Sequence, residues 1–77
     1  MAARRQHTAA YKRMCALLLR LRTEAKLTQR DLAEKLAMHN SMVHRSEIGD
    51  RRIDPVEFAA WCRACGVDPG EAIRGLG

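Results

Sequence analysis

The chain has 77 residues, enough for one small domain but too few for the deep cleft of a typical enzyme, so we expect no catalytic activity. Its balance is basic, with 14 Lys and Arg residues against 9 Asp and Glu, which favours a polyanionic partner such as nucleic acid or an anionic membrane. No apolar run approaches the ~18 residues of a membrane span. Three cysteines, an odd number, fit a reducing compartment, so the expected location is the cytoplasm.

The positive charge is concentrated at the N-terminus. Residues 1–23 contain six cations and no acid, whereas the remaining residues contain eight cations and nine acids. Residues 1–8 show no apolar period and are predicted to form a flexible basic arm before a single domain over residues 9–77. Arg4 and Arg5 of this arm are candidates for DNA backbone contacts. The alternative is a tail that contributes only charge and solubility.

The first two helices are predicted from apolar spacing and capping. A helix over about residues 9–25 follows from apolar side chains three or four residues apart: Tyr11, Met14, Leu18, Leu21 and Ala25. Thr28, followed by Asp31 three residues later, has the form of a capping box and opens a second helix. The inner face of this second helix is expected to consist of Leu32, Ala33 and Leu36.

Three more short helices are predicted after the turn at residues 37–39, and no segment alternates like a strand. The third helix runs to about Ile48, and Gly49 suits the left-handed conformation that closes a helix. Residues 54–57 and 68–71 both place Asp at the cap, Pro in the first turn and Glu third. The core stripe predicted for the fourth helix is Phe58, Trp61, Cys62 and Cys65. The fifth helix, over about residues 69–75, offers Ala72, Ile73 and Leu76 to the core.

The second and third helices are predicted to form a helix-turn-helix. Two helices of about eight residues joined by three residues must cross steeply. Both helices are expected to pack against the first helix through Leu32, Leu36, Met38 and Val43. The free face of the third helix is polar and carries Asn40, Ser41, His44 and Arg45. Arg and Asn can bind guanine and adenine edges bidentately, so this face is a candidate for reading DNA, with an ordinary solvated surface as the alternative.

Residues 27–36, LTQRDLAEKL, and residues 41–49, SMVHRSEIG, resemble the Cro/repressor (XRE) family of helix-turn-helix domains. The resemblance extends from about Leu18 to Gly66. It implies a compact, all-α, lambda-repressor-like domain of five helices whose third helix enters the major groove of double-stranded DNA. The expected function is a sequence-specific transcription regulator, with repression favoured, acting as a homodimer on an inverted-repeat operator.

The resemblance also assigns roles to single positions. It implies base contacts from three residues at the start and in the middle of the third helix: Asn40, Ser41 and Arg45. His44 lies on the same polar face and is a further candidate for a base contact. It implies backbone contacts from the second helix, the turn and the loop after the third helix: Gln29, His39, Arg51 and Arg52. Arg22 and Glu47 resemble a family pair that forms an internal salt bridge between the first and third helices.

Three positions depart from the family pattern. Lys26 and Ala37 stand where glycine is common in the family. Each is therefore expected either to lower the stability of the fold by about 1 kcal/mol or to change the conformation of its turn. Ser46 stands where an apolar or aromatic residue normally packs. A buried serine needs a hydrogen bond, and the carbonyl of Met42, four residues earlier, is the expected acceptor.

The remaining motifs favour structural roles. Residues 61–65 read WCRAC, like the dithiol of thioredoxins, but they fall within a helix and on its apolar stripe, so core packing is predicted over redox chemistry. One such motif supplies two metal ligands where structural zinc needs four, so no metal or cofactor is expected. The dimer interface is expected among the leucines of the first helix and a few later residues: Ile53, Val67, Ile73 and Leu76. The alternative function is a protein-interaction module on the same fold, an antitoxin or anti-activator adaptor with a regulatory protein partner.

Overall fold

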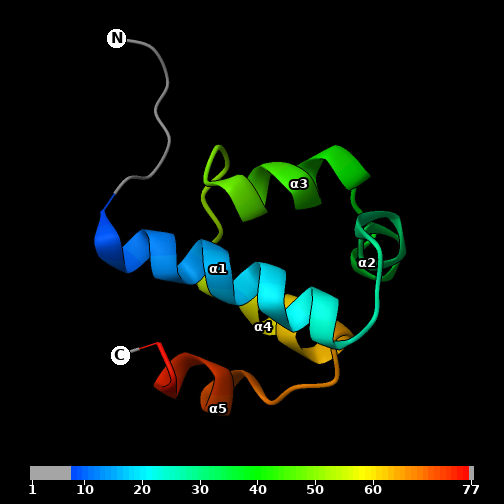
Figure 1. Cartoon of the computed structure of the whole chain (residues 1–77). Helices are drawn as coiled ribbons and strands as arrows, with labels where there is room; N and C mark the ends of the chain where they lie inside the picture. The colour runs from blue at the N-terminus through cyan, green and yellow to red at the C-terminus, as the bar shows by residue number, and fades with distance from the viewer. Residues whose placement is uncertain (1–7, 77) are drawn as a thin grey trace, which may run out of the picture.

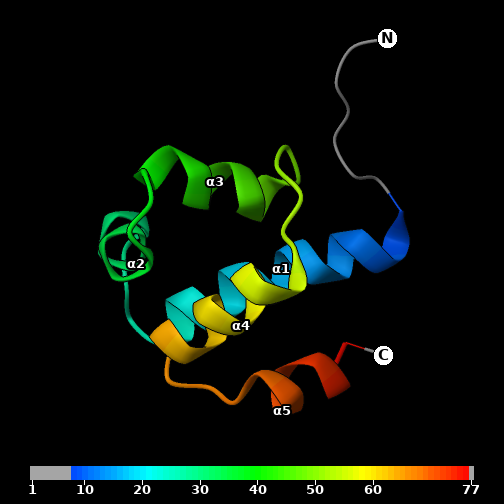
Figure 2. The same ribbon diagram turned by 180° about the vertical axis from the view of Figure 1, so that it is seen from behind.

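The computed structural model describes residues 8–76, and within this range the chain forms five α-helices and no strand. They are α1 (Ala9–Glu24), α2 (Gln29–Leu36), α3 (Asn40–Ile48), α4 (Pro55–Ala64) and α5 (Pro69–Arg74). The helix α3 runs along one edge of the molecule and α5 along the opposite edge, with α1 and α4 between them (Figures 1 and 2). The predicted all-helical architecture is confirmed. Of the predicted arm, residues 1–7 lie outside the described residues, and Thr8 caps α1.

Side-chain caps begin all five helices, which explains why the helix starts could be read locally. At α2, Thr28 Oγ1 accepts from the Asp31 amide at 3.0 Å, and the Asp31 carboxylate accepts from the Thr28 amide at 2.9 Å. The hydrogen bond from the Thr28 backbone, followed by that from its side chain, lowers the pKa of Asp31. Asp54 and Glu57 form the same reciprocal box at α4. Asp68 caps α5 by accepting from the Glu71 amide at 3.0 Å.

The core is centred on Trp61, which is fully buried in α4. Its indole Nε1 donates to the carbonyl of Leu18 at 3.2 Å and so ties α4 to α1. The other buried apolar side chains of this cluster are Leu17, Leu18, Leu21, Leu32, Ala33, Val43, Phe58 and Cys62. Through this cluster the helix-turn-helix of α2 and α3 is packed together with α1 and α4.

Several expected core positions are less buried than predicted, among them Cys65 and Ile73. Cys65 is half-buried instead of buried, because it caps the end of α4. Ile73 is 43% exposed, because the short α5 lies at the edge of the molecule and packs chiefly on α4. Burial raises the pKa of both the Cys62 and the Cys65 thiols, the opposite of the lowered pKa that a redox dithiol needs.

The two turns without glycine keep their left-handed geometry. Lys26, after α1, has φ of 61°, and Ala37, after α2, has φ of 54°. A side chain with a Cβ atom in this conformation costs about 1–2 kcal/mol relative to the right-handed one. The turns are therefore strained and not reshaped, and α2 and α3 keep the tight connection that a helix-turn-helix requires.

Candidate nucleic-acid interface

The helix α3 has one buried face and one exposed face. Val43, Ser46 and Glu47 point into the protein, where α3 packs against α1 and α2. The polar side chains singled out from the sequence all lie on the exposed side: Asn40, Ser41, His44 and Arg45. Ser46 satisfies its buried hydroxyl by donating to the Met42 carbonyl at 2.8 Å, as predicted. The result is a helix that lies along one edge of the molecule (Figure 1), with one face packed in the core and the polar side chains exposed.

The N-terminus of α3 is organised by His39. The ring Nδ1 accepts from the Ser41 amide at 3.2 Å and lies 2.9 Å from the Ser41 hydroxyl oxygen. His39 therefore acts as the N-cap of α3, in place of the more usual Ser, Thr, Asp or Asn. Both side chains are exposed, so the cap leaves them at the surface where the first turn of α3 begins.

A chain of hydrogen bonds joins α1, α2 and α3 beneath the polar face. Arg22 of α1 binds the Glu47 carboxylate with two nitrogens, Nε at 2.6 Å and Nη2 at 3.1 Å, and its Nη1 donates to the Leu27 carbonyl at 2.9 Å. The side chains of Arg22 and Glu47 are only 12% and 4% exposed. Gln29 Nε2 adds a third donor to Glu47 at 3.0 Å and lies 3.3 Å from His44 Nδ1. The amide of Gln29 is thus directed toward α3.

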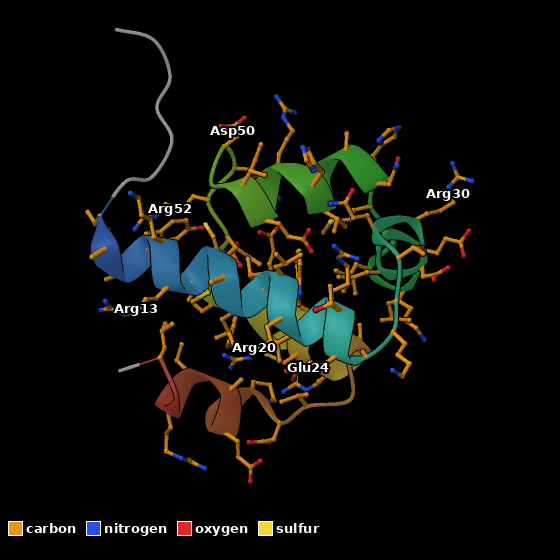
Figure 3. All side chains as sticks on the ribbon, in the orientation of Figure 1. Arg13, Arg20, Glu24, Arg30, Asp50 and Arg52 are labelled. Carbon is orange, nitrogen blue, oxygen red and sulfur yellow. The ribbon has the colours of Figure 1, made fainter. Side chains whose placement is uncertain are left out.

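The loop after α3 holds its two arginines differently. Arg51 forms a bidentate pair with Glu57, at 3.2 and 2.5 Å, and donates to Ser46 Oγ at 3.3 Å. The hydrogen bond with Glu57 raises the pKa of Arg51. Arg52 is exposed and stacks over the ring of Tyr11, 4.5 Å from its centroid, above the first turns of α1 (Figure 3). The hydroxyl of Tyr11 also accepts from the Ile53 amide at 3.0 Å.

Some side chains that hold or extend this surface could not be identified from the sequence pattern. Tyr11 is 42 residues from Ile53 along the chain, so no local spacing connects it with the loop. Glu57 was expected only as a capping residue of α4, yet it also neutralises Arg51. Arg30, in the first turn of α2, is a further exposed cation and points outward beside the start of α3 (Figure 3). Arg4 and Arg5, the predicted arm contacts, lie outside the described residues.

Among residues 8–76, no three His, Cys, Asp or Glu side chains lie where they could hold a metal ion together. Within this part of the chain, no helix has the length and apolar character to cross a membrane.

Comparison with known proteins identifies the domain. The sequence matches the family described as a helix-turn-helix domain over residues 13–74. The structure is similar to an XRE-family like protein from Pseudomonas syringae pv. tomato str. DC3000, with a TM-score of 0.85 and 38% identity over 91% of this chain and 85% of that chain.

Two structures of the clp gene regulator ClgR from Corynebacterium glutamicum share the fold, with TM-scores of 0.79 and 0.78 at 20% identity. They cover 92% and 97% of this chain, and 76% and 94% of their own chains. No curated protein matches the sequence. The family match over most of the chain and the relative at 38% identity show that the protein belongs to the XRE family of helix-turn-helix DNA-binding domains.

Proposed function

We propose that the protein is a transcription regulator that reads a specific DNA sequence by inserting α3 into the major groove. The observation that carries this proposal is the division of α3 into a face locked in the core and an exposed polar face. An α-helix fits the major groove, and its first turns make most base contacts. The proposed base-reading residues are Asn40, Ser41, His44 and Arg45. Repression by occupancy of the operator is the proposed mode of action.

Phosphate contacts are proposed to set the position of α3 on the duplex. The residues assigned to the backbone surround the start of α3 and its following loop, with the arm added from the sequence: Gln29, His39, Arg51, Arg52, Arg4 and Arg5. Such contacts fix register and orientation but carry no base information directly. Arg52 is well placed for this role, because its guanidinium is exposed and is positioned in part by stacking on Tyr11.

Replacing Arg45 with Ala tests the base-reading role. We expect the variant to lose about 1–3 kcal/mol of binding free energy on the preferred sequence and to relax the preference at one base position. The measurement is a titration of the two proteins against a set of single-base variants of the operator. Arg74→Ala, on the opposite edge of the molecule, removes the same charge and serves as the control. Equal loss on every duplex would show that Arg45 contacts the backbone.

Replacing Arg52 with Ala tests the backbone role of the loop. We expect weaker binding to all duplexes alike, and a log–log salt dependence that is flatter by about one unit, because one phosphate contact is lost. Arg51→Ala is expected to flatten the slope similarly and, unlike Arg52→Ala, to lower thermal stability through the lost pair with Glu57. A salt slope unchanged in either variant would remove that arginine from the phosphate contacts.

The proposed regulator acts as a homodimer, so that two copies of α3 meet the two halves of an inverted repeat. Support comes from an open apolar hollow of about 470 Å³ between α1, α4 and α5, whose walls include Met14, Ile53, Phe58 and the exposed Ile73. A second copy covering this hollow would bury Ile73, the large apolar side chain of α5 that is exposed to solvent.

Replacing Ile73 with Asp is expected to give a monomer with an unchanged fold, because the side chain is partly in solvent already. Sedimentation of both proteins at micromolar concentration, with and without operator DNA, measures the effect. Glu71→Gln, in the same short helix, is the matched control and should leave the dimer intact. A wild-type protein that stays monomeric in both conditions contradicts the dimer.

A second candidate function is a protein-interaction module on the same fold. The observation that favours it is Val56, which is 78% exposed at the rim of another hollow, lined partly by Leu36, Met38 and Met42. Salt separates the two functions, because DNA affinity falls steeply as salt rises, whereas a largely apolar protein interface tolerates it.

A further inference from the structure

Gln29 Nε2 lies between two acceptors, and this position fixes the orientation of its amide. It is 3.0 Å from Glu47 Oε1 and 3.3 Å from His44 Nδ1. Glu47 is bound by Arg22 and is therefore an ionised carboxylate, which can only accept hydrogen bonds. The amide nitrogen of Gln29, which can only donate, must face it. The orientation of Gln29 is thus set by the buried pair and not by His44.

This orientation determines which nitrogen of His44 carries the proton. Because Gln29 Nε2 is a donor, His44 Nδ1 must act as the acceptor when the two are bonded. A neutral imidazole has one N–H group, so the proton of neutral His44 lies on Nε2. His44 is exposed on the polar face of α3, and no described residue forms a hydrogen bond with its Nε2. When His44 is neutral, the helix therefore presents an Nε2–H donor at this position.

We propose that Gln29 and Glu47 are positioning residues for DNA recognition, which hold His44 in the tautomer whose Nε2–H donates to an acceptor on the DNA. The acceptors available in the major groove are purine N7, guanine O6 and thymine O4, and a phosphate oxygen has the same chemistry. Cytosine N4 is a donor and is rejected by this arrangement. The proposal rests on the proposed function, since it requires that α3 faces DNA. It gives Gln29 a role through His44 that is separate from a direct phosphate contact.

The first arm of the test is independent of DNA. Nitrogen-15 NMR of the histidine rings in the free protein, at a pH alkaline enough to neutralise them, distinguishes the protonated from the unprotonated ring nitrogen. We expect His44 in the wild type to be almost entirely protonated on Nε2, and Gln29→Ala to show a mixture of both tautomers. His39, which accepts from the Ser41 amide through Nδ1, is an internal control that Gln29→Ala should not affect. A wild-type His44 protonated on Nδ1, or a spectrum unchanged in Gln29→Ala, overturns the proposal.

The second arm uses two substitutions of His44 that separate its nitrogens. His44→Gln can place an amide donor near the position of Nε2, whereas His44→Asn is too short to do so and offers an acceptor only toward Gln29. We expect His44→Asn to weaken operator binding about tenfold and His44→Gln to retain most of the affinity. Gln29→Ala should lose affinity on the same duplexes as His44→Asn.

The pattern of loss identifies the acceptor. A relaxed preference at one base pair means that His44 donates to a base, and a uniform loss on all sequences means that it donates to a phosphate. Both results support the donor role, and full binding by His44→Asn overturns it. A wild type that binds no DNA at all would refute the proposed function and the DNA role of His44 together, while the NMR arm would still decide whether Gln29 sets the tautomer.

Discussion

Replacing Glu47 with Ala is expected to cost about 3–5 kcal/mol of unfolding free energy, because it leaves Arg22 as a largely buried charge without its carboxylate. A domain of this size has about 4–12 kcal/mol of stability in total, so much of it would be lost. Gln29 would also lose the acceptor that orients its amide. Denaturant unfolding of the wild type and the variant measures the difference directly.

A surface ion pair in the same protein provides the matched control. Arg20 and Glu24 of α1 are 3.9 Å apart and mostly exposed, so Glu24→Ala should change stability by about 1 kcal/mol or less (Figure 3). A loss of that small size for Glu47→Ala would contradict the structural role of the buried pair.

A double replacement, Arg22→Met with Glu47→Leu, separates stability from recognition. Apolar residues of similar volume commonly replace a buried pair with little loss of stability, so the double variant should fold. We nevertheless expect it to bind the operator more weakly than the wild type, because Glu47 no longer fixes the Gln29 amide, which in turn contacts His44. Wild-type affinity in a folded double variant would show that the pair serves stability alone.

Replacing Trp61 with Ala is expected to cost about 3–5 kcal/mol, comparable to the loss of Glu47. The side chain is fully buried where α1 and α4 meet, and its removal leaves a cavity and breaks the hydrogen bond from the indole to the Leu18 carbonyl. Thermal or denaturant unfolding reports the loss. Val56→Ala, in the same helix but 78% exposed, should stay within about 0.5 kcal/mol of the wild type. Equal stability of the Trp61 and Val56 variants would contradict the position of the core.

Helix starts and the buried serine could be predicted because they depend on residues close in sequence. Thr28 and Asp31 are three residues apart, and Ser46 binds a carbonyl four residues back, so the pattern contains both partners. The exposed side of α3 follows in the same way from helical periodicity. The pairing of Arg22 with Glu47 came only from family resemblance, because 25 residues separate them.

The features that escaped prediction depend on how distant elements pack. The contacts of the Gln29 amide with Glu47 and His44 could not be predicted, because these residues lie 18 and 15 residues further along the chain. Arg51 was expected only as a contact to the DNA backbone, and its ion pair with Glu57 forms because the chain returns into α4 beside it. The exposure of Ile73 depends on how α5 packs against the rest of the protein. The apolar spacing within a helix of six residues does not determine this packing.

The measurement that tests the central claim most directly is selection of bound duplexes from a random-sequence DNA library at about physiological salt, carried out with the wild type and with Arg45→Ala. The account predicts that the wild type enriches an inverted repeat with half-sites about one helical turn apart, and that Arg45→Ala relaxes one base position in each half. Weak, salt-sensitive binding with no enriched sequence would mean that the polar face of α3 does not read bases.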